Sequence, residues 1–348
     1  MREIGDLLGI NNGRNNGSYG IEIETSSFSP YDVPSIRSWA STTDGSLRNF
    51  GIEYLLKSPK NYEQIPNALT ELSEALKDIT FCNDSYCSVH IHMNVKSFTM
   101  VQALNLICLW YLFEDLLVNY CGPDRDGNVF CLKNKQAEFG YFSIVRALER
   151  DSLSNLFLHF NEDTFKYGAL NLSSISIRGS LEVRTLGEVN DMRTLSQVQE
   201  WVNILDKIYV AAKMYNTPSD IIEHFEKSTN FLNDIFKDCT EKLTDKFNED
   251  IDKTIKGNAF YVLSIDEALK RNIEYGQNTP VQESPQPERN EVEARPMHTL
   301  DEYWTESSFN PITNERLNQR VDERALEVRL GLRGTDHSII ITDDPSNS

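Results

Sequence analysis

The chain has 348 residues, of which 39% are hydrophobic and 10% aromatic, so it is long and apolar enough to bury a substantial core. Its 53 acidic residues outnumber the 34 basic residues, and the formal charge of −19 argues against general binding to nucleic acid or to anionic membranes. The opening segment MREIGDLLGI has neither a long apolar run nor a cleavage pattern, so a cytoplasmic protein is expected.

The first part of the chain predicts short strands followed by a helix. A Gly- and Asn-rich segment, NNGRNNGS, leads into a predicted strand over Tyr19–Thr25. A turn at 44–46 then separates two short strands, the second of which carries Glu53. Apolar residues at helical spacing predict an amphipathic helix over 61–79 that covers one face of a sheet.

The most apolar stretch, Phe98–Tyr120, predicts a long helix that ends at Cys121-Gly122-Pro123. The helix is long enough to cross a membrane, but polar residues interrupt it: Gln102, Asn105, Glu114 and Asp115. Such side chains are costly in hydrocarbon, so a buried core helix is predicted instead of a membrane span.

Two further helices are predicted over 143–160 and 191–215, and a strand-like run over Tyr167–Leu172 lies between them. Beyond these elements, apolar residues at helical spacing over 232–255 predict one more helix, closed by Gly257. Helices and strands therefore alternate in blocks along the chain.

The composition changes near residue 277, because six of the twelve prolines fall in 277–348. The predicted organisation is a catalytic domain over 1–276, in which 19–215 carries the motifs and 216–276 is a helical extension. The proline-rich tail that follows is expected to be mostly disordered, with a short helix over 314–331, and to offer a surface for a protein partner.

Three strand-like segments share one design, in which apolar residues alternate with residues able to bind metal or phosphate. They are Ile21-Glu22-Ile23-Glu24, Val89-His90-Ile91-His92 and Leu181-Glu182-Val183-Arg184. Successive side chains of a strand point to opposite faces, so one sheet would carry the polar set on one face and bury the apolar set. Neighbouring glutamates repel each other unless a cation lies over them, so the pattern predicts a metal–phosphate site.

Two alternatives stay open on these residues alone. Alternating polar and apolar residues also occur on any half-exposed antiparallel strand. Cys82 and Cys87 precede His90 and His92 at close range, which suggests a zinc site as an alternative. However, Cys87 and His90 would point to opposite faces of one strand. The six cysteines are otherwise scattered along the chain, so free thiols are expected.

Five groups of residues follow one another along the chain: YGIEIE, DGSL with GIEYLLKSP, CSVHIHMN, KYGALNL and SLEVRTLGEVNDMRTLSQVQEWV. Together they resemble the putative amidoligases, which are related to glutamine synthetase and glutamate-cysteine ligase, over roughly 19–215. The resemblance implies an α+β fold with a glutamine-synthetase-like antiparallel sheet packed with helices. In that fold the sheet forms one wall of a funnel-shaped active site, which ATP enters from one end and a carboxylate substrate from the other.

The resemblance also implies a set of metal ligands. Glu22 and Glu24 resemble paired strand glutamates that bind two different Mg²⁺ or Mn²⁺ ions. His90 resembles the histidine that completes the nucleotide-side ion together with Glu22 and Glu182, and Glu53 resembles a further ligand on the substrate side. Carboxylate oxygens are the ligands that magnesium prefers, so the residue types suit this role.

Phosphate contacts are implied for two more residues. His92 resembles a histidine that touches the nucleotide phosphate, and Arg184 resembles the arginine that steadies the transferring phosphoryl group. Glu53 is the residue that we assign as base for the incoming amine. The chain departs from the pattern of glutamine synthetase in lacking a clear second carboxylate close to Glu53, and no motif is matched beyond Tyr215.

Five residues are weaker candidates for contacting substrate. Tyr167 and Asn171 fall in KYGALNL, and Arg125 follows the long helix where the family tends to carry an arginine that could meet a carboxylate. Asp44 and Ser46 lie in the predicted turn. Each of these residues also has a purely structural interpretation, as a turn former, a strand end or a surface arginine.

The sequence therefore predicts an ATP-binding, Mg²⁺- or Mn²⁺-dependent carbon–nitrogen ligase. It would join a small-molecule or peptide carboxylate to an amine through an acyl phosphate. A guanidino-type kinase of the same superfamily is the first alternative. A catalytically silent interaction protein with an acidic surface is the second, and it would turn over no ATP.

Overall fold

The computed structural model describes residues 2–278, apart from 11–16, 44–46, 48, 83, 137, 151–152, 161–164, 166 and 190. The chain divides into two units, Met1–Ala294 and Arg295–Ser348, and every described residue lies in the first. The predicted tail, from residue 279 onward and with its helix over 314–331, therefore lies outside the described residues.

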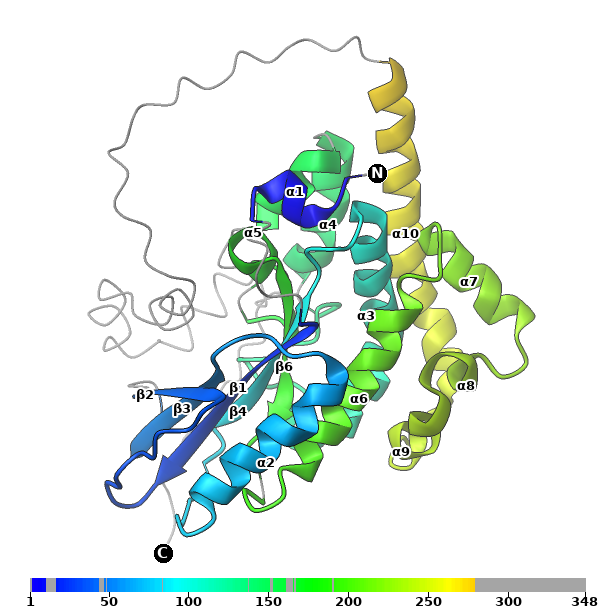
Figure 1. The fold of residues 1–348 in the computed structure, drawn as a ribbon. Helices are drawn as coiled ribbons and strands as arrows, with labels where there is room; N and C mark the ends of the chain where they lie inside the picture. Colours follow the sequence, from blue (N-terminus) through cyan, green and yellow to red (C-terminus); the bar gives the residue numbers. More distant parts are fainter. Residues whose placement is uncertain are drawn as a thin grey trace, which may run out of the picture. The chain divides into compact units, whose positions relative to one another are not determined.

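An antiparallel sheet of six strands organises the described part of the chain (Figure 1). The strands are β1 (Tyr19–Ser27), β2 (Trp39–Thr43), β3 (Phe50–Leu56), β4 (Ser88–Asn94), β5 (Leu170–Asn171) and β6 (Ser180–Gly187). Their order across the sheet is β2-β3-β1-β4-β6-β5, which places β1 and β4 at the centre. Together with the helices described below, this sheet confirms the predicted α+β class.

The alternation in the three motif-bearing strands divides the sheet into two chemically different faces. Its apolar residues are at most 1% exposed and belong to the main core: Ile21, Ile23, Val89, Ile91, Leu181 and Val183. The side chains between them necessarily point to the other face, which we call the polar face. Burial of the apolar set fixes the strand register, because a one-residue slip would move every one of these side chains out of the core.

Helices α2 (Ile65–Leu76) and α6 (Ser196–Ala211) lie side by side along the sheet (Figure 1). The indole nitrogen of Trp39 on β2 donates to the carbonyl of Ala68 on α2 at 2.8 Å. On α6, the hydroxyl of Tyr209 donates to the carbonyl of Asn94 at the end of β4 at 2.7 Å. Both helices fall within the predicted ranges and hold the apolar side of the sheet, leaving the polar face for other contacts.

Helix α3 (Met100–Tyr120) is the predicted core helix. It begins at Thr99, whose side chain and that of Gln102 cap each other's backbone nitrogens, and it ends just before the predicted Gly-Pro signal. By length and composition alone it could cross a membrane, but 89% of its most apolar stretch is buried inside the fold. That is how the central helix of a globular domain is packed.

The remaining helices surround α3 or join the strands. They are α1 (Ile4–Leu8), α4 (Glu138–Arg150), α5 (Ser174–Arg178), α7 (Pro218–Lys227), α8 (Phe231–Phe236), α9 (Thr240–Thr244) and α10 (Ile251–Asn278), with 3₁₀ turns at Tyr62–Gln64 (η1), Pro123–Arg125 (η2), Leu153–Phe160 (η3) and Lys237–Cys239 (η5). Helix α10 packs along α3, α4 and α7 (Figure 1).

The prediction of one helix over 232–255, closed by Gly257, is wrong. The apolar residues of this range are divided among α8, η5, α9 and the start of α10, because the backbone turns at Lys237, where φ is +50°. Gly257 lies inside α10 with open space around it, so it does not end the helix. The helix predicted over 143–160 likewise begins earlier, at Glu138, and gives way to η3 after Arg150.

Candidate functional site

Strand pairing brings the predicted ligands together on the polar face. Glu22 lies opposite His90 on β4, and Glu24 lies opposite Glu53 on β3. His92, two residues beyond His90, lies opposite Glu182 on β6. Residues far apart in the sequence thus form one continuous row across four neighbouring strands, as the shared alternation predicted.

The carboxylate of Glu22 sits between the two imidazoles. Its Oε1 lies 3.0 Å from His92 Nε2, and its Oε2 lies 3.2 Å from His90 Nδ1. Burial favours a higher pKa for Glu22, but His92 and His90 outweigh it and hold the pKa of this carboxyl well below its usual range. Glu22 is therefore an ionised carboxylate in a largely buried position.

Glu182 is held from both sides. Its Oε2 accepts hydrogen bonds from Asn171 Nδ2 at 2.8 Å and from Ser174 Oγ at 3.0 Å, while its Oε1 lies 2.5 Å from Arg184 Nη1. Burial again opposes ionisation, but Arg184 and the two histidines outweigh it, so the pKa of Glu182 is lowered to about 2. This carboxylate is ionised and fixed in orientation.

Glu22, His92 and Glu182 form a group, among the described residues, that could hold a metal ion. One donor atom from each lies within 4.8 Å of the other two. Two ionised carboxylates and an imidazole suit Mn²⁺ or Mg²⁺, so the residues fit the predicted ion. The group contains no cysteine, and all six cysteines are free.

The geometry divides the two histidines differently from the roles that the resemblance implied. His92, expected to touch phosphate, is the imidazole of this group. His90, expected to complete the nucleotide-side ion, has Nδ1 3.2 Å from Glu22 and 3.6 Å from Glu182, and Nε2 2.8 Å from Ser88 Oγ. Both imidazoles therefore border the two carboxylates, with His90 displaced towards Glu24.

Glu24 and Glu53 occupy the next register position along the row. Glu24 Oε2 accepts from both the backbone nitrogen and the hydroxyl of Ser88, each at 2.8 Å. Glu53 is 9% exposed on the neighbouring strand. Among the described residues these two carboxylates join no group of three close donors, so the second ion remains a prediction.

Arg184 places a cation on the polar face. One guanidinium nitrogen is engaged by Glu182, whereas Nε is buried and has no hydrogen-bond partner among the described residues. A buried N–H without an acceptor costs free energy, and such a group at a functional site calls for an explanation. An anionic oxygen of a ligand beside Glu182 would satisfy it.

Arg125 acts on the backbone that carries Arg184. Its Nε donates to the carbonyl of Thr185 and its Nη2 to the carbonyl of Arg184, both at 2.8 Å, and the residue is 7% exposed. The pairing of β4 with β6 is irregular here, since its register shifts between Val89 and Ile91. These contacts fix the distorted strand, and the substrate carboxylate suggested for Arg125 stays a prediction.

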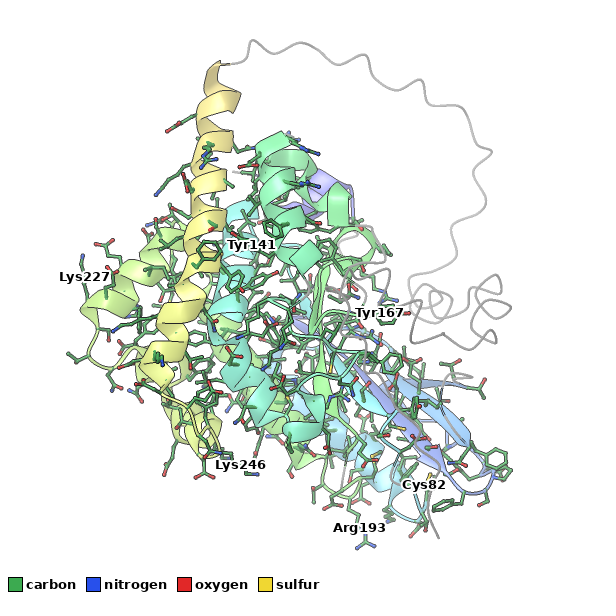
Figure 2. The ribbon with its side chains drawn as sticks, turned by 180° about the vertical axis from the view of Figure 1, so that it is seen from behind. Cys82, Tyr141, Tyr167, Arg193, Lys227 and Lys246 are labelled. Carbon is green, nitrogen blue, oxygen red and sulfur yellow. The ribbon has the colours of Figure 1, made fainter. Side chains whose placement is uncertain are left out.

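The other candidates for substrate contact lie in different places. Asn171 lies at the end of β5 and holds Glu182, as described above. Tyr167 is 37% exposed and lies at the surface (Figure 2). Asp44 and Ser46 lie outside the described residues.

A buried support behind β5 was not predicted. Asn134 accepts from the backbone nitrogen of Leu170 and donates to its carbonyl, both at 2.7 Å, as a neighbouring strand would. The backbone nitrogens of Asn134 and Lys135 in turn donate to the carboxylate of Glu114 on α3, at 2.5 and 3.1 Å. A polar residue inside an apolar helix was the only signal of this support in the sequence.

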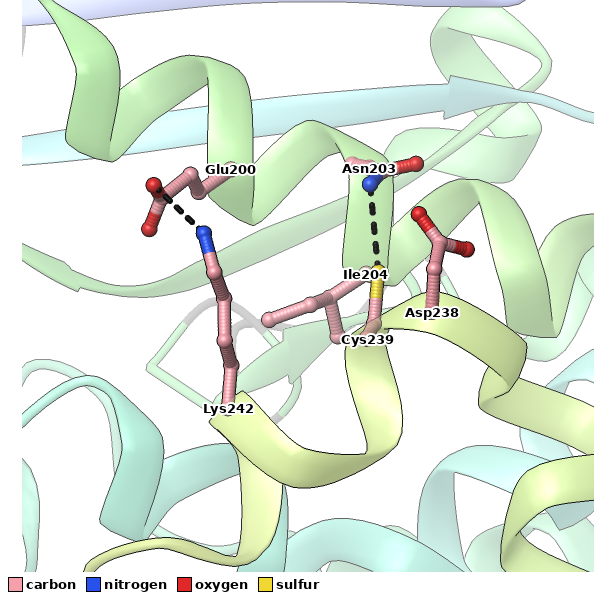
Figure 3. A pocket seen from close by; sticks show the side chains of 6 residues that line it. All are labelled: Glu200, Asn203, Ile204, Asp238, Cys239 and Lys242. Carbon is pink, nitrogen blue, oxygen red and sulfur yellow. Dashed lines mark hydrogen bonds and ion pairs between the residues drawn. The ribbon is translucent and has the colours of Figure 1, made fainter.

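Two of the cavities bordered by described residues are small. One of about 60 Å³ is lined by Glu200, Asn203, Ile204, Asp238, Cys239 and Lys242, away from the polar face (Figure 3). Its charged lining is already engaged, because Lys242 pairs with Glu200 at 2.8 Å. The other, of about 20 Å³, adjoins Glu24 and is bordered by Glu188 and Met192. Only the second touches the candidate site.

Comparison with known proteins agrees with the motifs. Residues 42–204 match the model of a family described as putative amidoligase enzyme, which confirms the predicted resemblance. The match covers Glu53, both histidines, Glu182 and Arg184, and it begins after β1, so Glu22 and Glu24 lie outside it. The family description supports an enzyme of the ligase type. No curated protein matches the chain.

Proposed function

We propose that this protein is an ATP-dependent carboxylate–amine ligase that works through an acyl phosphate. The observation that carries the proposal is the unpartnered Nε of Arg184, buried beside the Glu22–His92–Glu182 group. A guanidinium with one free donor next to a set of metal ligands matches what a transferring phosphoryl group requires. The description of the matched family supports amide formation as the outcome.

The roles of the side chains follow from their contacts. Glu22, His92 and Glu182 would hold Mg²⁺ or Mn²⁺, and the bound ion would neutralise phosphate charge. Asn171 and Ser174 keep Glu182 in place, and Arg125 fixes the backbone from which Arg184 extends. Arg184 Nε and the outer guanidinium nitrogens would donate to the phosphoryl oxygens as charge develops on them.

The proposed reaction has two steps. An oxygen of the substrate carboxylate attacks the γ-phosphorus of ATP, which gives an acyl phosphate and ADP. The amine then attacks the acyl carbon, and inorganic phosphate leaves with that carboxylate oxygen. Glu53, opposite Glu24 and 9% exposed, is our candidate for the base that takes the proton from the amine.

The polar face would form one wall of the predicted funnel. The Glu22–His92–Glu182 group occupies its β4–β6 side, and Glu24 with Glu53 occupies its β3 side. We assign nucleotide phosphates to the first side and the carboxylate and amine to the second. The small cavity that adjoins Glu24 is also bordered by Glu188, and two carboxylates beside it suit an ammonium group next to Glu24.

Isotope transfer tests the mechanism. The full chain is incubated with ATP, MgCl₂ and a panel of amines and ¹⁸O-labelled carboxylates, and products are detected by mass spectrometry. The proposal expects one amide and one labelled inorganic phosphate for each ADP. A phosphorylated guanidine without labelled phosphate would establish the kinase instead. If no ATP is converted to ADP with any member of the panel, a silent binding protein would be favoured.

A further inference from the structure

Three exposed aromatic side chains contact one another on the surface. Tyr86, Phe130 and Tyr167 are 39%, 48% and 37% exposed. The ring centroids of Tyr86 and Phe130 lie 6.2 Å apart, and those of Phe130 and Tyr167 lie 6.3 Å apart. We call these residues the aromatic cluster. They come from three separate segments, so their meeting at the surface is a property of the fold.

Each segment is attached to the polar face close to Arg184 or Glu24. Tyr86 stands two residues before Ser88, which donates twice to Glu24. Tyr167 stands two residues before Ala169, whose carbonyl accepts from the backbone nitrogen of Arg184 at 3.0 Å. Two residues of chain span at most about 7 Å, so the backbone that carries these two rings lies close to Glu24 and Arg184.

Phe130 is attached to the same region from the third side. Its segment follows Arg125, which binds the backbone of Arg184, and the next residue, Cys131, is fully buried. Burial raises the pKa of the Cys131 thiol, and the nearby guanidinium groups of Arg125 and Arg184 oppose that rise. The thiol next to Phe130 is therefore within electrostatic reach of Arg184.

The cluster is held in place although its rings are exposed. The backbone nitrogen of Phe130 donates to Asn128 Oδ1 at 2.9 Å. On the other side of Cys131, Leu132 donates to the carbonyl of Tyr167 at 3.0 Å and accepts from Ala169 at 2.7 Å. The rings are therefore presented by fixed backbone, which lowers the entropy lost when a ligand packs against them.

A flat aromatic ligand suits this surface better than a protein segment. Tilted rings about 6 Å apart offer faces for stacking, and base–aromatic stacking tolerates any base because every base has a π face. A nucleotide with its phosphates at Arg184 must place its base somewhere along the border of the site. The aromatic cluster is an exposed ring surface that adjoins Arg184 through the segments of Phe130 and Tyr167, and adjoins Glu24 through the segment of Tyr86.

We propose that Tyr86, Phe130 and Tyr167 form the platform on which the purine base of the nucleotide stacks. This inference rests on the proposed ATP-dependent function and adds the location of the base to it. The phosphates would then run from the platform past Arg184 to the Glu22–His92–Glu182 group. Discrimination among purines would be weak, because stacking recognises the ring rather than its edge.

The test separates base from phosphate binding in the full chain. Dissociation constants for ATP and for inorganic tripolyphosphate, each with MnCl₂, are measured by calorimetry for wild type and Phe130→Leu. Leucine keeps an apolar side chain and removes the ring, so ATP should bind at least about fivefold more weakly, with tripolyphosphate unchanged. Phe142→Leu, which alters a 56% exposed ring on α4, is the matched control and should change neither constant.

A second pair of variants guards against loss of folding. Tyr167→Phe keeps the ring and should bind ATP as wild type does, whereas Tyr167→Leu should resemble Phe130→Leu. Unchanged ATP binding in both leucine variants would overturn the platform and leave the proposed ligase standing. If these variants lose the same factor of affinity for ATP and for tripolyphosphate, the platform is overturned as well. If wild type binds neither ligand, the proposed function fails and the platform with it.

Discussion

Asn171 Nδ2 donates to Glu182 Oε2 at 2.8 Å, so a strand of two residues orients a carboxylate of the candidate metal group. Strand β5 is itself held by Asn134, which bonds both backbone polar groups of Leu170. The support therefore extends from α3 through the segment around Asn134 to Glu182. Residues behind metal ligands often matter nearly as much as the ligands.

Asn171→Ala should weaken Mn²⁺ binding by about 10-fold while the fold remains intact, because Glu182 loses a donor that fixes its orientation. Calorimetric titration with MnCl₂ measures the effect. Asn128→Ala, which removes a half-buried loop amide that donates to no carboxylate among the described contacts, is the control. Equal affinity of Asn171→Ala and wild type would mean that Glu182 is not a ligand or needs no such support.

Glu24 and Glu182 should differ in what their loss does to stability. Both alanine variants should abolish turnover. Glu182→Ala should also cost about 3 kcal/mol in the free energy of unfolding, since it leaves the largely buried Arg184 without its carboxylate. Glu24→Ala removes no ion pair found among the described residues, although Ser88 loses the acceptor of two hydrogen bonds, so its loss of stability in urea should be smaller than that of Glu182→Ala.

The double variant Glu182→Ala with Arg184→Leu checks this explanation. It should recover part of the lost stability, because an uncompensated charge is then no longer buried. If the double variant is less stable than Glu182→Ala alone, the stability loss comes from packing instead. If Glu24→Ala melts far below wild type, Glu24 is a structural residue.

Glu114 should give the protein a pH-dependent stability near neutrality. Burial raises the pKa of Glu114 to about 7, despite the backbone nitrogens of Asn134 and Lys135 that donate to it. Between the ordinary value of 4.5 and about 7, the folded state keeps a proton that the unfolded chain has lost. Rising pH through this window therefore removes stability.

Urea unfolding of wild type and Glu114→Gln at several pH values measures this contribution. The glutamine does not titrate, so the wild type should lose on the order of 3 kcal/mol relative to the variant between about pH 5 and pH 8. Glu223→Gln, an exposed carboxylate on α7, controls for the change of residue type. Parallel pH profiles for wild type and Glu114→Gln would show that Glu114 titrates at its ordinary pKa.

Local patterns were enough to predict the two faces of the sheet. The period of two in β1, β4 and β6 assigns Glu22, His90 and Glu182 to one face, and their neighbours to the core, before any pairing is known. The helical spacing in α2 and the length of α3 were readable for the same reason. These signals depend only on residues close together in the sequence.

The parts that sequence patterns missed depend on pairing between distant segments. Which histidine lies close to both Glu22 and Glu182 depends on the pairing of β4 with β6, whose register shifts after Val89. The hydrogen bonds from Arg125 to backbone carbonyls of β6 likewise depend on distant pairing, and the carboxylate contact stays a prediction. Ser88 could have been found, because it continues the alternation of His90 and His92 by one more step.

The chain beyond α10 should be dispensable for folding and turnover. A truncation ending at Asn278 keeps every described packing contact of α10, including Asn258 Nδ2 donating to the carbonyl of Leu112 at 3.1 Å. It should remain soluble and melt as the full chain does. A truncation ending at Asp250 removes α10, exposes the apolar surface of α3 and should fail to fold. If the variant that ends at Asn278 is insoluble, the predicted tail contributes to the folding of the domain.

Arg184→Lys should lower the maximal rate much more than it weakens ATP binding. Lysine keeps the positive charge but lacks the Nε donor that is buried without a partner in the described residues, and it cannot form a fork on a phosphoryl oxygen. Loss of one donor to charge that develops in the transition state costs about 100-fold in rate. Steady-state kinetics of ADP release measure kcat and KM for ATP, with the exposed Arg193→Lys as a control that should change neither. A rise in KM with kcat unchanged would assign Arg184 to nucleotide binding alone, because only an interaction that strengthens in the transition state lowers kcat when it is removed.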